Sequence, residues 1–195
     1  MSCTAVSSAE NVSTQSFCRI ANKFIAGMEE ESEMSYPDPR YQGETGEISA
    51  FYRPAGQKPE LTIGSGTAVR YLATGASTRG EFGLYRWDAK AHTPGPSAHF
   101  HKTMSESFFI VSGTVRLFNG ERWIDAVAGD FLFVPQGGVH GFKNESDDSA
   151  SMLILFAPGA PREAYFEALA AKAAGRQFSE QEWKDLCVQH DNYFV

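Results

Sequence analysis

Two stretches of the chain decide the fold: residues 94–113, PGPSAHFHKTMSESFFIVSG, and residues 129–144, GDFLFVPQGGVHGFKN. His99 and His101 are two residues apart, which on a strand places both imidazoles on one face. Glu106 follows after four residues, where a β-rich run begins, so a short bend brings its carboxylate beside the histidines. Two nitrogens and one oxygen on one face form a metal-ligand set that leaves other coordination positions open.

The second stretch is expected to form a strand, a turn at residues 135–137 and a further strand that starts near His140. If that strand faces the first pair of histidines, His140 completes a set of three histidines and one glutamate. Taken singly, a buried histidine is more often a core residue than a ligand. The combined pattern, H-x-H-x4-E-x6-G and then, sixteen residues later, G-x5-P-x-G-x2-H-x3-N, is too specific to arise by chance.

These two patterns resemble the paired motifs of the cupin superfamily. The second motif is matched at all of its fixed positions, Gly129, Pro135, Gly137, His140 and Asn144. The first is matched at His99, His101, Glu106 and Gly113, but its usual leading glycine falls at Thr93, and Gly95 stands nearby. The resemblance is strong over residues 82–158. It implies a mainly β, double-stranded β-helix (jelly-roll) barrel, with one divalent transition metal held by His99, His101, Glu106 and His140.

The pattern outside the motifs agrees with a β-rich body, because short runs of β-forming residues alternate with Gly, Pro and Asn. Nine strands are predicted, at residues 49–53, 67–72, 82–88, 107–112, 114–118, 122–127, 131–134, 139–143 and 151–156. Asn119–Gly120 has the preferred composition of a two-residue hairpin turn. Many strands at such short spacing indicate an antiparallel sandwich or barrel.

We divide the chain into an N-terminal extension (1–45), the barrel (46–160) and a C-terminal helical segment packed on the barrel (161–195). In the extension, apolar residues at helical spacing over residues 17–28 predict a short helix, and a Ser-rich transit peptide is the rival interpretation. In the C-terminal segment, residues 164–174 are rich in strong helix formers. Ser179-x-x-Glu182 is a capping box that starts a second helix.

Composition excludes several classes of protein. The 195 residues are 42% hydrophobic, enough for one domain with a real core. A net charge of −7 without a basic cluster argues against nucleic acid, and no apolar run approaches the roughly 18 residues of a membrane span. Cys3, Cys18 and Cys187 form no C-x-x-C pair, so we expect free thiols and a cytoplasmic location. Open barrel edges and a mobile N-terminal arm favour a homodimer.

The residues around the motifs favour an apolar or aromatic small-molecule substrate, because phenylalanines crowd both motifs and no inward cluster of lysine or arginine is evident. Arg86 or Arg116 would weaken this inference if either pointed inward. His92 and His190 lie outside the motifs, and we expect both at the surface. Asn144 and Asp130 are interpreted as turn-stabilising residues outside the active site.

Three functional classes remain open, because one fold hosts many chemistries. Similarity in size and in barrel-then-helices layout to small quercetinase-like monocupins favours a metal-dependent dioxygenase acting on a phenolic or enolic molecule. In that reaction Glu106 is either a firm ligand only or also the general base. The second class is a non-redox lyase, isomerase or polyketide cyclase, and the third is a ligand-binding cupin without catalysis. The metal is expected to be Fe, Mn, Ni, Cu, Co or Zn. Histidine and carboxylate ligands accept all six ions, so the ligands alone do not identify the metal.

Overall fold

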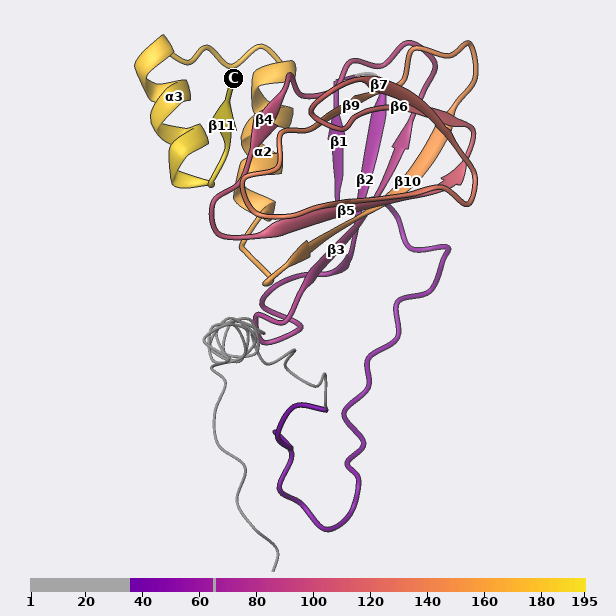
Figure 1. Cartoon of the computed structure of the whole chain (residues 1–195), viewed down its shortest axis with the longest axis vertical. Coiled ribbons are helices and arrows are strands. Elements are labelled where there is room, and N and C mark those ends of the chain that lie inside the picture. The colour runs from indigo at the N-terminus through magenta and orange to yellow at the C-terminus, as the bar shows by residue number, and fades with distance from the viewer. Residues whose placement is uncertain (1–35, 65) are drawn as a thin grey trace, which may run out of the picture. The chain divides into compact units, whose positions relative to one another are not determined.

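The computed structural model describes residues 36–64 and 66–195, and the chain divides into two compact units, residues 1–50 and 51–195. The described part of the first unit, residues 36–50, contains no helix or strand. The predicted helix at residues 17–28, the rival transit peptide, Cys3 and Cys18 lie outside the described residues. All of the β-structure described below belongs to the second unit (Figure 1).

The second unit is built from antiparallel sheets. The largest has six strands in the order β1-β2-β3-β10-β5-β8. Their bounds are β1 Leu61–Ile63, β2 Thr67–Ala73, β3 Gly83–Ala89, β10 Ala150–Ala157, β5 Ser105–Ser112 and β8 Phe131–Val134. A three-stranded sheet has the order β7 (Trp123–Val127), β6 (Thr114–Phe118) and β9 (Gly141–Lys143), and β11 (Tyr193–Phe194) pairs with β4 (His99–Phe100). This mainly β architecture confirms the predicted jelly-roll barrel.

Eight of the nine predicted strands are present, with ends that differ by a few residues. The strand predicted at residues 49–53 is wrong, because these residues form no strand and both Phe51 and Tyr52 are exposed. The apolar side chains there face no sheet that would bury them. Three short strands, β1, β4 (His99–Phe100) and β11, were not among the predicted ranges, since each is held by a partner strand rather than by a sequence pattern of its own.

The hairpin between β6 and β7 forms, but its tip is shifted by one residue from the prediction. Phe118 pairs with Trp123, and the amide of Asn119 donates to the carbonyl of Arg122 at 3.2 Å. The two residues at the tip are therefore Gly120 and the one after it, and only Gly120 has a positive φ, of +94°. The side chain of Asn119 accepts from the amide of Arg122 at 2.9 Å, so it closes the turn instead of forming its tip.

Glycine is required at two places that bear on the motifs. Gly113 has φ of +70°, and a Cβ there would lie 2.4 Å from the carbonyl oxygen of Ser149. At Gly95 a Cβ would lie only 1.7 Å from the carbonyl oxygen of Phe142, so the loop before β4 approaches β9 closely. Gly95 thus supplies the close approach near the position where the first motif usually carries a glycine and this chain has Thr93.

The core lies inside the barrel and extends under the C-terminal helices. Side chains alternate along the strands: Phe108 on β5 is fully buried, whereas Phe109, Phe131 and Phe133 point outward and are exposed. α2 (Glu163–Ala173) and α3 (Glu180–Gln189) follow the last barrel strand, and the capping box at Ser179 is present as predicted. No helix in the described part of the chain is long and apolar enough to cross a membrane.

Aromatic rings join α2 to the barrel. The ring of Phe166 on α2 meets that of Tyr85 on β3 edge-on, with centroids 5.1 Å apart and an interplanar angle of 88°. The hydroxyl of Tyr85 donates a hydrogen bond to Oε1 of Glu163 at 2.6 Å, which also ties the first turn of the helix to the sheet. The thiol of Cys187 on α3 is free and buried in the same core. The helices therefore form a wall at one end of the barrel.

Candidate metal centre

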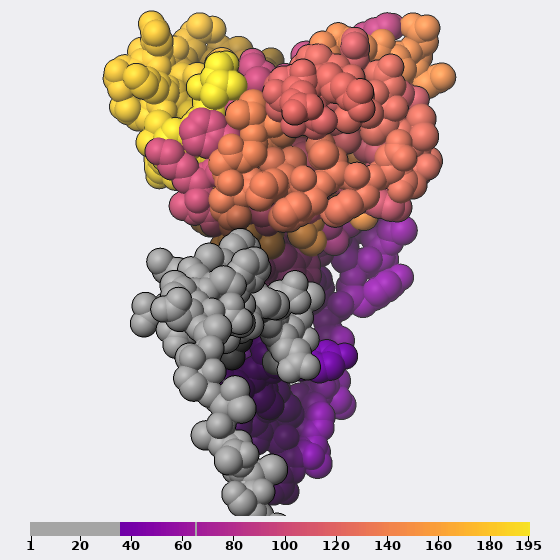
Figure 2. Space-filling model, in the orientation of Figure 1, coloured from indigo at the N-terminus to yellow at the C-terminus, as the bar shows by residue number. Residues whose placement is uncertain are grey.

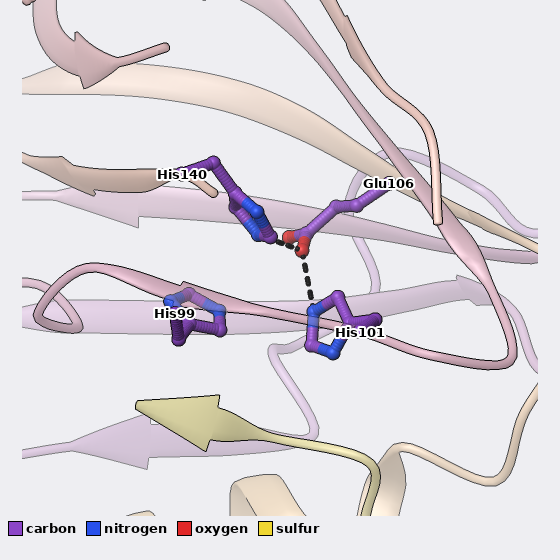
Figure 3. Close-up of side chains that lie close together, drawn as sticks. All are labelled: His99, His101, Glu106 and His140. Carbon is purple, nitrogen blue, oxygen red and sulfur yellow. Dashed lines mark hydrogen bonds and ion pairs between the residues drawn. The ribbon is translucent and has the colours of Figure 1, made fainter. Parts of the chain in front are cut away.

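The structure brings together all four residues that the sequence analysis singled out as ligands. His99 lies in β4, His101 follows that strand, and Glu106 lies near the start of β5. His140 lies just before β9, and its backbone pairs with that of His99 through two N–H···O bonds of 2.9 Å. The four side chains converge on one space inside the barrel (Figure 3).

The donor atoms are close and shielded from solvent. His99, His101, Glu106 and His140 are all at most 5% exposed, and one ligand atom from each lies within 4.8 Å of the others. Oε2 of Glu106 is 2.9 Å from Nε2 of His101 and 2.7 Å from Nε2 of His140. Nitrogen and carboxylate oxygen donors in this number suit a first-row divalent metal.

The second nitrogen of each imidazole is held by a backbone carbonyl. Nδ1 of His99 contacts the carbonyl of Ser97 at 2.8 Å, and Nδ1 of His140 contacts that of Gly138 at 3.0 Å. Nδ1 of His101 contacts the carbonyl of Asp191. Because a carbonyl only accepts, Nδ1 carries the proton in each ring, and the Nε2 atoms that face the site have lone pairs in the neutral form.

This protonation pattern tests whether the residues fit a metal. A neutral imidazole protonated at Nδ1 has no hydrogen at Nε2 to donate to Glu106. The approach of two Nε2 atoms to one carboxylate oxygen therefore requires either charged imidazoliums or a cation among the donors. The arrangement fits a divalent metal, whose four ligands would be the three Nε2 atoms and the Glu106 carboxylate.

The electrostatics agree with this assignment. Burial lowers the pKa of His99 to about 4, so its imidazole is neutral near pH 7. Burial alone would raise the pKa of Glu106, but contacts with His101 and His140 outweigh it and hold the pKa well below the ordinary value. Burial opposes charge on His140 as well, yet its contact with Glu106 raises the pKa. The site thus presents an ionised carboxylate and a neutral imidazole, both of which are metal-binding forms.

The C-terminal residues complete the site, and the sequence analysis missed them. β11 pairs with β4, so the last residues of the chain lie against the first histidine motif, where yellow meets pink in Figure 2. The ring of Phe194 lies 5.6 Å from that of His99. The Asp191 carboxylate accepts from the amides of Lys102 and Thr103, at 3.0 and 2.9 Å. No local pattern signals this contact, which joins residues about ninety positions apart.

A cavity of about 1010 Å³ opens next to the metal centre, between the barrel and the C-terminal helices. His99 and Glu106 reach its surface from the metal-centre side. Much of the remaining wall is aromatic, formed by Trp87, Phe142, Phe156, Tyr165, Phe166, Trp183 and Phe194. A volume of this size accommodates a multi-ring organic molecule.

The cavity wall also bears on one premise of the substrate prediction. Arg86 and Arg116 are partly exposed and paired with surface carboxylates, so neither points inward. However, Arg162, which directly precedes α2, is only 3% exposed and lines the cavity, as do Lys90 and Lys172. The sequence showed no inward cluster of lysine or arginine, and it gave no sign of this one buried arginine, because the turn that carries Arg162 over the barrel end is set by tertiary packing.

The other residues considered in the sequence analysis lie outside the metal centre. His92 is exposed, as predicted, and contacts Asp147 at 2.9 Å. His190 is half-buried rather than at the surface, because its ring packs 5.8 Å from that of Tyr165. Asn144 and Asp130 stabilise turns as predicted: the Asn144 amide donates to the carbonyl of Asp148, and the Asp130 carboxylate accepts from an amide at the end of β7.

The barrel is a jelly roll, and its buried His-His-Glu-His group could hold a metal ion. Residues 85–156, which contain both motifs, match the family model of the cupin domain. The match covers 72 of the 195 residues, from β3 to β10. No curated protein sequence matches the chain.

Solved structures with the same fold include a predicted oxalate decarboxylase from Thermotoga maritima, 16% identical, with a TM-score of 0.50 over 56% of this chain and 99% of that one. An RmlC-like cupin from Shewanella frigidimarina is 20% identical, with a TM-score of 0.49 over 60% of this chain and 96% of that one. The polyketide cyclase RemF from Streptomyces resistomycificus is 19% identical, with a TM-score of 0.43 over 52% of this chain and 69% of that one. At these identities the likeness shows the fold and leaves the reaction open.

Proposed function

We propose that this protein is a metal-dependent cupin enzyme, a dioxygenase that acts on a phenolic or enolic small molecule. One observation carries the proposal: the four-donor group opens, through His99 and Glu106, into a cavity with aromatic walls. A metal ion that prefers five or six ligands would keep one or two coordination positions free when bound by these four donors. A ring compound in the cavity then lies beside the ligands.

The residues of the site have different roles in this reaction. His99, His101 and His140 hold the metal, and their backbone carbonyl partners keep the rings oriented. A metal held there would polarise the substrate oxygen as a Lewis acid and relay electrons from the substrate, which is oxidised, to dioxygen, both of whose atoms enter the product. Glu106 accepts the proton of the substrate hydroxyl, once an incoming substrate displaces its contacts with the imidazoles. The aromatic wall holds the ring of the substrate and excludes water.

A second candidate is a non-redox lyase, isomerase or cyclase at the same site. It is favoured by the buried Arg162, because a fixed cation beside an ionised Glu106 stabilises an enolate without any oxidant. The two candidates differ in their need for oxygen. A dioxygenase consumes dioxygen in a one-to-one ratio with substrate, whereas a lyase or cyclase works equally well under nitrogen.

The test is an oxygen-electrode assay of the metal-loaded protein with phenolic compounds, a flavonol such as quercetin and a hydroxy acid such as 3-hydroxy-2-naphthoate, repeated under nitrogen. We expect oxygen uptake in proportion to the compound consumed, and no consumption under nitrogen. Arg116→Gln is the control, because this arginine is paired with surface carboxylates and does not line the cavity, and we expect it to retain full activity. Turnover that is unchanged under nitrogen would replace the dioxygenase with the non-redox candidate.

A further inference from the structure

Arg162 is the one arginine among the described residues that lines the cavity beside the metal centre. It is the residue just before α2 and is 3% exposed. Its Nη2 donates to Oδ1 of Asn192 at 3.1 Å, and its Nη1 donates to the carbonyl of His190. The guanidinium also lies 4.8–4.9 Å from the ring centroids of Phe156 and Tyr165. These contacts fix its position against the C-terminal residues.

The charge of Arg162 is not matched by these contacts. A guanidinium has five N–H donors, and the two hydrogen bonds above go to neutral oxygens. Its Nε makes no hydrogen bond, and no carboxylate of residues 36–64 or 66–195 forms an ion pair with it. Glu106 acts on the guanidinium through space, but its carboxylate is held by His101 and His140 and forms no ion pair with Arg162. Burial of a cation without a directly paired carboxylate carries a desolvation cost that neutral acceptors do not fully offset. If the only role of Arg162 were to hold the C-terminal residues in place, a neutral hydrogen-bond donor could do the same without the cost of burying a charge.

The cavity has an excess of positive charge in its wall. Its charged lining residues are Lys90, Arg162 and Lys172 against Glu106 alone. The ammonium of Lys172 stacks on the ring of Trp183 at 3.5 Å and is solvent-exposed, so Arg162 is the deeply buried cation. A buried guanidinium beside several aromatic rings is complementary to an aromatic molecule that bears an anionic oxygen.

From this arrangement we infer that Arg162 binds a carboxylate of the substrate, so that the substrate is an aromatic or enolic carboxylic acid. The carboxylate lies against the guanidinium, and the ring occupies the aromatic part of the cavity, with its hydroxyl towards His99 and Glu106. This inference rests on the proposed function, because it assigns the substrate class of the same site. It adds a specificity-determining residue that lies in neither histidine motif.

The inference is tested by binding alone, in protein treated with a chelator, so that no metal competes for the carboxylate. The probes are 3-hydroxy-2-naphthoate and its uncharged amide, titrated by calorimetry into the full chain. We expect the acid to bind about tenfold to a hundredfold more tightly than the amide, the range for a hydrogen-bonded charge pair. Equal affinities, or no binding of the acid, would overturn the inference without any need for a variant.

Variants then assign the preference to a residue. Arg162→Gln is expected to abolish the preference for the acid, and Arg162→Lys, which keeps a cation, to retain part of it. Arg116→Gln, at a surface arginine outside the cavity, is the control and is expected to leave the preference unchanged. A preference that persists in Arg162→Gln, or that is lost in Arg116→Gln, would contradict the assignment. If Arg162→Gln does not fold, judged by circular dichroism, the Arg162→Lys and Arg116→Gln pair decides. Because no step requires metal or oxygen, failure of the dioxygenase proposal would leave these results intact.

Discussion

Asp191 links the C-terminus to the metal centre, and its replacement by alanine is predicted to weaken both folding and metal binding. Its carboxylate accepts from the amides of Lys102 and Thr103 and from the Thr103 hydroxyl, which lies 2.7 Å from Oδ2. The carbonyl of the same residue accepts from Nδ1 of His101. Loss of the carboxylate therefore frees the chain that directly follows His101 and loosens the segment whose carbonyl holds the His101 ring.

The size of the effect follows from two terms. Loss of a side chain that caps backbone amides costs about 1 kcal/mol. Asp191 also has φ of +57°, a conformation that aspartate and asparagine tolerate and alanine resists, which adds about 1 kcal/mol. We expect Asp191→Ala to lower the free energy of unfolding by about 2 kcal/mol, and Asp191→Asn to lower it by less than about 1 kcal/mol, because asparagine keeps the φ and one acceptor.

Metal affinity is the second measurement on these variants. Loosening a backbone partner of a metal-bound histidine typically costs tenfold or more in affinity, so we expect about a tenfold loss for Asp191→Ala. Urea unfolding and Zn²⁺ titration against a chromophoric chelator give the two numbers, and Asp147→Ala, on an exposed aspartate away from the site, is the control. Wild-type metal affinity in a folded Asp191→Ala would refute the positioning role of the C-terminus.

The same carboxylate predicts a pH dependence. Burial would raise the pKa of Asp191, but the hydrogen bonds from Thr103 and Lys102 outweigh it and lower the pKa below the ordinary 3.8. A lowered pKa means that the stabilisation is fully present above pH 3.8 and is lost as the pH falls through the folded-state value. The stability difference between wild type and Asp191→Asn should therefore be constant at neutral pH and shrink in acid. A difference that grows in acid would show that the carboxylate is not held by these amides.

Three further predictions concern the core, the outer sheet face and the catalytic carboxylate. Phe108→Ala, which removes a fully buried ring, should lower the free energy of unfolding by about 3–5 kcal/mol in urea titrations. Phe109→Ala, at a side chain that is 42% exposed, should lower it far less. Equal losses of stability would contradict the alternation of buried and exposed side chains along β5. The exposed Phe131 and Phe133 on β8 offer an apolar surface for the expected homodimer. Sedimentation should therefore give twice the chain mass for the wild type and a single chain mass for Phe131→Glu. A monomeric wild type would rule the dimer out. Glu106→Gln should keep part of the metal and lose turnover, and unimpaired turnover would exclude Glu106 as the base.

The sequence predicted the metal centre well because the residues that form it lie in two short motifs. The spacing of His99, His101 and Glu106 places them on one strand and the next, and His140 reaches them through the pairing of its backbone with His99. Most strands were predicted for the same reason, since period-two alternation is a local signal. The tip of the β6–β7 hairpin was misplaced because the side chain of Asn119 closes the turn, a choice between neighbouring registers that composition does not decide.

What the sequence did not predict depends on long-range packing. β11 is two residues long and exists because β4 offers it backbone partners. Arg162 precedes a run that predicts only a helix, and its burial in the cavity wall depends on where the turn before α2 crosses the barrel end. Contacts of this kind bring together residues far apart in the chain, and no periodicity records them.

The central claim is that His99, His101, Glu106 and His140 hold one divalent metal ion. Its most direct test is the metal content of protein purified without added metal or chelator, measured by mass spectrometry for the wild type, His140→Ala and the control His92→Ala. The account predicts about one transition-metal ion per chain in the wild type and the control, and loss of the ion from a folded His140→Ala. Full metal content in His140→Ala, or no metal in the wild type even after reconstitution, would contradict it.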